Sequence, residues 1–521
     1  MPFALLRASW VLLSLFGLFL ARILYGHVQY VRARGVHGCG EARKYPHKDP
    51  LFGFDLYRVR RDAKERGYRN MLSRRLFQEN GKTFKANVFG SSWIYTMELE
   101  NIKTIATSIS DFGMGTMRQG VGAQFVGFGV VTTDGAVWQH SRALIKPIFA
   151  RKQIANLHSF GAHVTYMIDL IPRDGSTVDL QMLIKRLFLD TSTEFVFGES
   201  VNSLLPSTSF DADTFLGTFD KALILLGKRL DLGPFHYFAG AHQEWKQTCR
   251  KVHAFVDGYV DKAIEEIHQE KDISKDGLSE SYTLIGELVK ETQDRDSLRH
   301  QIMNVFFPAR DSTAIGVSNV FFQLARHPRV WHKLREEVVN TAPRALSIEL
   351  LNSMIYLKNV INESGSSTVC QLVIRTRLTF SGLRLHSPVG HAARTCLKDA
   401  ILPCGGGPDG KLPIFVPKGQ FISIHFDAMQ RDQDLWGEDA QEFQPERWET
   451  HRAGWEYAPF LGGPRICPAK QMVLTEIAYV VVRLLQEFKS IECRDPETMY
   501  LERQRMTTES RNGVQVALYP V

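Results

Sequence analysis

Apolar residues recur at helical spacing along most of this chain. Segments that repeat apolar positions about every 3.6 residues predict helices at 152–171, 214–227, 242–270, 299–327 and 468–488. Strand-like runs are fewer and shorter: one lies at 93–97, and another at 414–416 follows the glycine-rich turn 405–410. We therefore expect a mainly α fold with a minor β-sheet region.

The longest uncharged apolar stretch lies near the N-terminus. Residues 8–21 carry no charge, and residues 5–25, with Arg7 and Arg22 near the two ends, approach the roughly 20 residues that a bilayer requires. The residues that follow are rich in basic side chains: Arg32, Arg34, Arg43, Lys44 and Lys48. This bias predicts a transmembrane helix with the remaining chain in the cytosol. A cleaved signal peptide is the alternative, although no convincing cleavage site follows the stretch.

The sequence shows no obvious boundary within its larger part. No low-complexity linker, internal repeat or long block of like charge divides it, so we expect a membrane anchor at 1–26, a linker at 27–55 and one large domain at 56–521. The net charge of +7 suits an anionic membrane surface or an acidic partner, and no basic-aromatic module predicts nucleic-acid binding. Seven cysteines without paired spacing fit a reducing compartment better than a disulfide framework.

The strongest chemical signal is a cysteine that follows a glycine-rich turn, in the sequence F-L-G-G-P-R-I-C-P-A at residues 460–469. Gly462 and Gly463 allow a tight turn beneath a flat macrocycle, and Arg465 suits a propionate. Cys467 would then give its thiolate to a haem iron. A buried structural cysteine is the alternative, but the pattern F-x-x-G-x-R-x-C-x-G is long, and only its last glycine is changed, to alanine.

This loop resembles that of the cytochrome P-450 family, in particular its fungal microsomal members and their alkane and fatty-acid hydroxylase branch. The resemblance covers nearly the whole chain and implies that 56–521 is a haem-thiolate catalytic domain. It implies a haem group (heme, iron protoporphyrin IX) with Cys467 as its axial ligand. The other cofactor-binding residues that it implies are Trp138, Arg142, Arg394, Phe460, Gly463 and Arg465, of which the first two match a W-x-x-x-R helix.

A second motif lies inside the helix predicted at 299–327. The sequence P-A-R-D-S-T at 308–313 resembles the family pattern A-G-x-D-T-T. The resemblance implies that Asp311 and the hydroxyls of Ser312 and Thr313 deliver protons during oxygen activation, since an acid beside a hydroxyl suits that task. A surface charge on a helix is the alternative for the acid alone. The proline that opens the motif removes a helical hydrogen bond and predicts a bend.

The resemblance also implies a buried ion-pair network of Glu363, Arg384 and Arg447 that supports the cysteine loop. Its E-x-x-R pair is interrupted, because Glu363 and Arg384 lie 21 positions apart with the 18 residues 365–382 inserted between them. Residues three apart share a helix face, so we expect the insertion to hold the pair apart. Our hypothesis is that 365–382 is a translated intron. The segment corresponds to a whole number of codons, and the codons of residues 378–382 could contain a branch site and a splice acceptor.

These features together predict a haem-dependent monooxygenase that inserts one oxygen atom of O2 into a lipophilic substrate, such as a long-chain alkane or fatty acid. One alternative is a tailoring oxidase of fungal secondary metabolism acting on a polyketide, terpenoid or peptide. Another is an inactive membrane-anchored product, because the E-x-x-R pair is split. The resemblance places Met506 and Thr507 at the substrate pocket.

The expected electron donor is a separate protein. The sequence has no G-x-G-x-x-G fingerprint after a strand, so we expect NADPH-derived electrons to come from a membrane-bound NADPH-cytochrome reductase. The expected location is the endoplasmic reticulum membrane, with a single membrane span and the catalytic domain in the cytosol.

Overall fold

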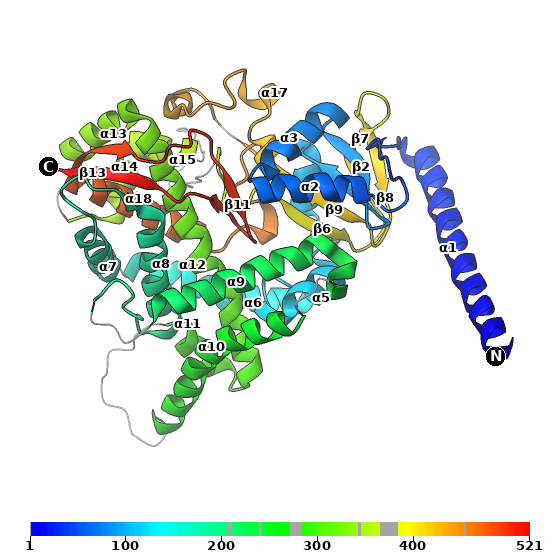
Figure 1. Ribbon diagram of the computed structural model, residues 1–521, viewed down its shortest axis with the longest axis horizontal. Helices are drawn as coiled ribbons and strands as arrows, with labels where there is room; N and C mark the ends of the chain where they lie inside the picture. The colour runs from blue at the N-terminus through cyan, green and yellow to red at the C-terminus, as the bar shows by residue number, and fades with distance from the viewer. Residues whose placement is uncertain are drawn as a thin grey trace. The chain divides into compact units, whose positions relative to one another are not determined.

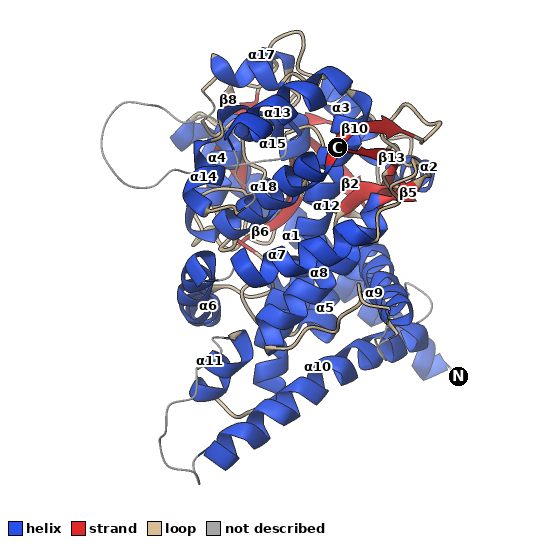
Figure 2. Ribbon diagram, turned by 90° about the vertical axis from the view of Figure 1, so that its left-hand side faces the viewer, coloured by secondary structure: helices blue, strands red, loops and turns tan. Residues whose placement is uncertain are grey.

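The computed structural model describes residues 2–155, 157–206, 211–238, 242–270, 283–341, 345–364, 384–452 and 454–521. Most of these residues form helices, and the strands form small sheets (Figure 1 and Figure 2). The predicted mainly α fold with a minor sheet is therefore confirmed. The predicted insertion at 365–382 lies outside the described residues.

The chain divides into two compact units. The first, which we call the sheet unit, comprises Met1–Leu56, Arg75–Gly113 and Ala393–Ile424. The second, which we call the helical unit, comprises Tyr57–Arg74, Met114–Ala392 and His425–Val521. Two helices, α2 (Phe54–Arg66) and α3 (Arg69–Asn80), contribute residues to both units.

A six-stranded sheet in the order β1-β2-β3-β9-β6-β4 forms the core of the sheet unit. Stacked aromatic rings hold its centre: Phe84 lies 5.2 Å from Tyr95 across the antiparallel β2–β3 pair, and Trp93 lies 5.0 Å from Phe421 across the parallel β3–β9 pair. The strands are β1 (Arg43–Lys44), β2 (Thr83–Val88), β3 (Ser91–Thr96), β4 (Phe112–Gly113), β6 (Ala392–Cys396) and β9 (Phe421–Ile424). Helix α4 (Leu99–Thr107) and the hairpin of β7 (Ala400–Gly406) and β8 (Leu412–Val416) complete this unit, so the predicted strands at 93–97 and 414–416 are confirmed.

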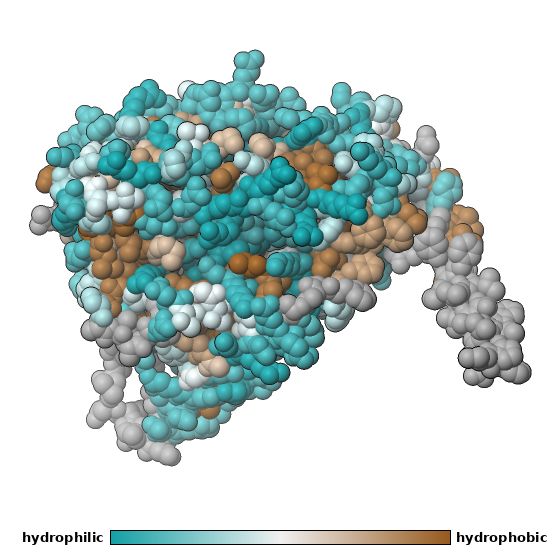
Figure 3. All heavy atoms as spheres, in the orientation of Figure 1, coloured by the Kyte–Doolittle hydropathy of each residue, from teal (hydrophilic) through white to brown (hydrophobic). Residues whose placement is uncertain are grey.

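The N-terminal segment forms one helix, α1 (Pro2–His37), which continues past the expected end of the anchor at residue 26. Several of its apolar side chains are exposed, among them Leu18, Leu24 and Tyr25. Among the residues that the structure describes, no helix is both long and apolar enough to cross a membrane. On the face seen in Figure 3, hydrophilic residues dominate and apolar residues gather in separate patches.

The helical unit is built around α12 (Arg295–Arg326), which begins at the N-cap Asp294, whose carboxylate accepts the Ser297 N–H at 2.9 Å. Helix α8 (Leu180–Phe197) packs along α12, and buried residues such as Phe188 and Phe321 fill a core between them and α18 (Lys470–Glu487). Pro308 lies inside α12, which continues as one helix to Arg326.

The remaining elements of the helical unit surround this core (Figure 1). The helices are α5 (Gly115–Val126), α6 (Gly135–Ala155), α7 (Leu157–Asp169), α9 (Ala212–Leu232), α10 (His242–Glu270), α11 (Leu284–Glu291), α13 (Pro328–Thr341), α14 (Ile348–Ser353), α15 (Ile355–Ser364), α16 (Phe426–Met429) and α17 (Gln433–Trp436). The strands are β5 (Val178–Asp179), β10 (Phe488–Cys493), β11 (Glu502–Gln504), β12 (Thr508–Ser510) and β13 (Gln515–Pro520). All five predicted helices are confirmed, although 152–171 corresponds to the end of α6 and to α7, on either side of residue 156.

Candidate functional site

The cysteine loop has a backbone that few side chains tolerate. Gly463 has φ 69° at the start of a 3₁₀ turn, Gly463–Arg465, where glycine avoids steric strain. A Cβ on Gly462 would lie 2.3 Å from the ring of Trp455, so this position also requires glycine. The N–H of Cys467 closes the loop on Phe460 O at 3.2 Å, and α18 begins three residues later.

Two basic side chains, Arg142 and Lys470, act on the thiol of Cys467. Burial raises the pKa of this thiol, while the Ala469 N–H and the charges of Arg142 and Lys470 act in the opposite direction. Burial also lowers the pKa of Arg142, and Cys467 opposes that shift. The structure thus brings together two of the predicted site residues, Arg142 from α6 and Cys467 from the loop, although burial outweighs the basic neighbours and keeps the pKa of the thiol above its ordinary value.

Arg465 is surrounded by more positive than negative charge. It donates to Asp134 Oδ1 at 2.6 Å and to Thr133 O at 2.9 Å, and its guanidinium carbon lies 4.5 Å from the ring centre of Trp138. Burial and the charge of Arg465 lower the pKa of Arg118 to about 10, although Asp134 opposes them. Sequence reasoning missed the roles of Arg118 and Asp134, for which no motif supplied a signal.

The unpaired donors of Arg465 fit an anionic ligand. Within the part of the chain that the structure describes, its Nε and Nη1 atoms are buried and have no hydrogen-bond partner. A buried guanidinium with unused donors is costly unless an acceptor fills the site. The propionates of a haem are such acceptors, so the residues present fit this cofactor.

Arg394, which sequence resemblance grouped with these residues, lies on β6 in the sheet unit. It is buried, and its Nη1 atom donates to Ala393 O at 2.9 Å.

The predicted ion-pair network forms in the helical unit. Glu363 and Arg384 are both fully buried, with Arg384 Nη2 2.7 Å from Glu363 Oε1 and Arg384 Nε 3.1 Å from Glu363 Oε2. Arg447 Nε and Trp448 Nε1 each donate to the same carboxylate at 2.8 Å. The expectation that the insertion holds the pair apart is therefore wrong.

The geometry at residues 364 and 384 explains this outcome. Ser364, the last residue of α15, and Arg384 form an isolated antiparallel β-bridge, so the backbone on the two sides of the insertion lies side by side. The entropy cost of closing a loop grows only slowly with its length. Spacing along the sequence therefore did not predict the contact, because tertiary packing makes it.

A glutamine connects this network to the cysteine loop. Arg384 Nη1 donates to Gln430 O at 3.1 Å, and Gln430 Nε2 donates back to Arg384 O at 3.2 Å. The side-chain oxygen of Gln430 accepts the N–H of Ala458 at 3.0 Å, two residues before Phe460. Gln430 is fully buried, and sequence reasoning did not identify it.

The three predicted proton-relay residues lie on α12 with different partners. Asp311 is buried, and its carboxylate accepts hydrogen bonds from Arg505 and Thr507. The hydroxyl of Ser312 donates to Pro308 O at 2.6 Å, one turn earlier. The hydroxyl of Thr313 is buried and has no partner within the described residues. The three groups are therefore adjacent in sequence but do not bond to one another.

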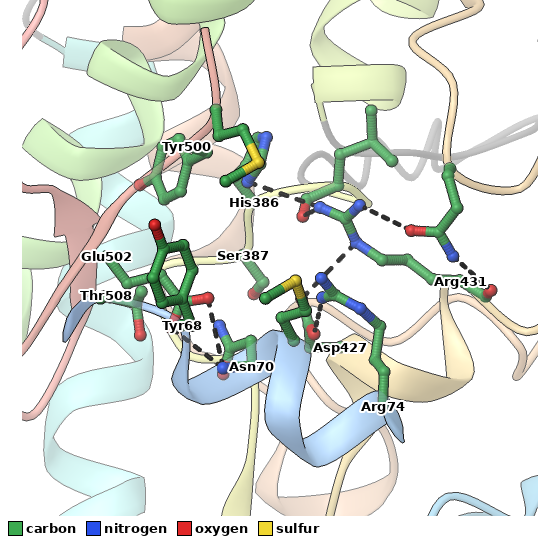
Figure 4. A pocket seen from close by; sticks show the side chains of 15 residues that line it. Tyr68, Asn70, Arg74, His386, Ser387, Asp427, Arg431, Tyr500, Glu502 and Thr508 are labelled. Carbon is green, nitrogen blue, oxygen red and sulfur yellow. Dashed lines mark hydrogen bonds and ion pairs between the residues drawn. The ribbon is translucent and has the colours of Figure 1, made fainter. Parts of the chain in front are cut away.

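A separate polar pocket of about 370 Å³ lies in the helical unit (Figure 4). Arg74 pairs with Asp427 at 2.9 Å, and Glu502 accepts the Asn70 N–H at 3.0 Å, where burial raises the pKa of Glu502 to about 7. None of the predicted catalytic, haem-binding or iron-binding residues lines it. The labelled lining residues are Tyr68, Asn70, Arg74, His386, Ser387, Asp427, Arg431, Tyr500, Glu502 and Thr508.

Comparisons with known proteins show which family the chain matches. A family model described as Cytochrome P-450 matches residues 60–365 and 380–516 and omits 366–379, which lie inside the predicted insertion. The chain is 37% identical to cytochrome P-450 monooxygenase apdE of Emericella nidulans, over 95% of this chain and 92% of the relative. It is 38% identical to monooxygenase iccC of Talaromyces variabilis (98% of each chain) and 36% identical to cytochrome P-450 52A12 of Debaryomyces hansenii (97% and 98%).

Proposed function

Because the chain belongs to the cytochrome P-450 family, it is a haem-dependent monooxygenase, and we propose that Cys467 is the thiolate ligand of its haem iron. The observation that supports this most directly is the cysteine loop, which Phe460 O closes at 3.2 Å and in which Arg142 and Lys470 bring positive charge to the sulfur. When bound, the haem would activate O2, of which one atom enters the substrate and the other leaves as water.

We assign haem binding to the residues around this loop. Arg465 offers two buried donors to a propionate, and Trp138 lies against its guanidinium. Arg142 lies one helical turn from Trp138 on α6, on the same face. We include Arg394, Phe460 and Gly463 in this set on the strength of their motif positions.

The proton supply is assigned to Asp311, Ser312 and Thr313. Asp311 is the acid, and the unpartnered hydroxyl of Thr313 is available to a water or substrate group. The ion pairs of Glu363 with Arg384 and Arg447 hold the segment before the cysteine loop through Gln430. The alternative of an inactive product rested on a split pair, and the contact between Glu363 and Arg384 argues against it.

The proposed reaction is hydroxylation of a lipophilic long-chain substrate such as an alkane or fatty acid. The side chains of Phe306 and Phe307 on α12 are buried among Phe125 and Phe219, which gives the helical unit a large apolar core next to the relay. A polyketide or terpenoid of secondary metabolism would suit the same surroundings. Product analysis with dodecane, dodecanoic acid and fungal extracts as probes separates these substrates.

We further propose that α1 attaches the protein to the endoplasmic reticulum membrane and that a membrane-bound NADPH-cytochrome reductase supplies electrons. The exposed apolar side chains of Leu18, Leu24 and Tyr25 support the attachment, since such a surface is costly in water. A variant that begins at residue 38 should leave the microsomal fraction for the supernatant. Retention of that variant in the membrane would refute this role for α1.

The spectrum of the reduced, carbon-monoxide-bound protein tests the proposed haem ligand. The full chain should give the red-shifted band after which the family is named, and Cys467→Ala should lose it. Cys493→Ala is a matched control, because Cys493 is also a partly buried free thiol in the helical unit. A thiolate band that survives in Cys467→Ala, or disappears in Cys493→Ala alone, would overturn the assignment.

A further inference from the structure

The acid of the proposed proton relay is held by a β-hairpin that lies far from it in the sequence. Strands β11 and β12 pair in antiparallel register, and residues 505–507 form the turn between them, with the Arg505 N–H bonded to Thr507 O at 2.8 Å. The side chain of Arg505 is only 1% exposed, and that of Asp311 is fully buried. Contacts between them are thus made away from water.

Both oxygens of the Asp311 carboxylate are bound by this turn. Arg505 Nη2 donates to Asp311 Oδ1 at 3.1 Å, and the Thr507 hydroxyl donates to Asp311 Oδ2. A carboxylate held by two donors has its rotation restricted, so the direction in which Asp311 points depends on the turn. On α12 itself, Ser312 is engaged with Pro308 O and does not contact this carboxylate.

The surrounding charges form a closed cluster. Arg505 also donates to Glu509 Oε2 at 2.6 Å and Asp220 Oδ1 at 2.5 Å. Lys185 Nζ lies 2.7 Å from Glu509, and Arg310 Nη2 lies 3.3 Å from Asp220. The groups of the cluster are thus three buried cations (Lys185, Arg310 and Arg505), two buried carboxylates (Asp311 and Glu509) and the partly exposed carboxylate of Asp220, contributed by α8, α9, α12 and the hairpin.

The positive and negative charges of the cluster balance one another without a bound ion. Burial raises the pKa of Asp220, but the charges of Arg310, Arg505 and Lys185 outweigh burial and lower it to about 2. Of the groups outside the buried set, Arg503 approaches Glu509 Oε1 at 3.8 Å from the exposed side of the hairpin. Arg505 and Thr507 join the acid of α12 to the hairpin, and Arg505 also connects it to Asp220 and Glu509.

We propose that Arg505, with Thr507, is a positioning residue for Asp311 and thereby couples the hairpin to proton delivery. Met506, between the two, packs against the apolar cluster that contains Phe306. A lipophilic substrate that displaces Met506 therefore shifts both donors of Asp311. The proposal rests on the proposed role of Asp311 as the acid.

Peroxide release by the full-length enzyme with reductase, NADPH and O2 tests this proposal without a known substrate. Arg505→Gln should lower the maximal rate on the order of 10-fold and enlarge the solvent isotope effect measured in D2O. Its pH–rate profile should differ from that of the wild type, because the substitution removes the positive charge that lies 3.1 Å from Asp311 Oδ1. Arg505→Lys should restore most of the rate and the profile.

Arg503→Gln is the matched control, since it removes the same charge from the same hairpin without touching Asp311. It should keep the wild-type rate and pH profile. Thr507→Val keeps every charge but removes the other donor to Asp311, so it should change the pH–rate profile less than Arg505→Gln does. This variant remains informative if Arg505→Gln fails to fold.

The carbon-monoxide spectrum distinguishes failure of the proposed function from failure of the positioning role of Arg505. If the wild type lacks the thiolate band, the proposed function fails. If the band is present in wild type, Arg505→Gln and Thr507→Val, and both variants keep the wild-type pH profile and isotope effect, the positioning role of Arg505 is refuted while the haem assignment stands.

Discussion

At the scale of single residues, Gly462 shows how closely the cysteine loop is packed. Replacing Gly462 with alanine puts a Cβ 2.3 Å from the Trp455 ring, so the ring or the loop must move. We expect Gly462→Ala to lower the free energy of unfolding by about 1–3 kcal/mol and to reduce the haem-to-protein absorbance ratio. Gly217→Ala is the control, because Gly217 faces open space on α9. This variant should lower neither the free energy of unfolding nor the haem-to-protein absorbance ratio.

The raised pKa of Glu502 makes the stability of the protein depend on pH. Burial raises the pKa of Glu502 from 4.5 to about 7, so the folded state binds more protons than the unfolded state between these values. The contribution of Glu502 to the free energy of unfolding therefore falls as the pH rises from about 4.5 to about 7, and it stays low at higher pH. Glu502→Gln should stabilise the protein by up to about 3 kcal/mol at pH 8 and by much less at pH 5.

Thermal unfolding at pH 5 and pH 8 checks this expectation. Arg503→Gln is again a suitable control, since Arg503 neighbours Glu502 on β11 but is exposed. An equal effect of Glu502→Gln at both pH values would show that the carboxyl of Glu502 does not titrate in this range.

At the scale of elements, α12 contains a proline that its hydrogen-bonding pattern does not favour. Pro308 has no N–H to donate to the carbonyl one turn earlier. Pro308→Ala restores a donor and should raise the free energy of unfolding by about 1–3 kcal/mol, which denaturant titration measures. A decrease would mean that ring packing of Pro308 contributes more than the missing hydrogen bond costs.

The elements also show what the sequence predicts and why. The helix predicted at 242–270 matches α10, whose apolar face packs on α9 while its other side meets water. The prediction for α12 began at 299 rather than 295, because a helix buried on most sides has little amphipathic pattern and its start depends on the cap Asp294. The family resemblance grouped Cys467 with Arg142 but gave no sign of Gln430 or Arg505, whose partners are distant in sequence.

At the scale of the whole molecule, the insertion is expected to be tolerated. Glu363 and Arg384 already meet in the full chain, so removing 365–382 shortens the connection between them without creating a new core contact. We expect both forms to show the thiolate band, and the shortened form to be more stable by about 1–2 kcal/mol through lower loop-closure entropy. A band in the shortened form alone would mean that the insertion breaks the Glu363 network in solution.

The bridge between Ser364 and Arg384 implies that this protein can be assembled from two fragments. Because the backbone enters and leaves the interruption at adjacent points, chain continuity there is not needed to bring Glu363 to Arg384. Two separately translated fragments, 1–364 and 384–521, would meet along α12, α15 and α18 through a buried apolar surface. An epitope, a protease site or a fused reporter inserted at this point should therefore leave the contact between Glu363 and Arg384 in place.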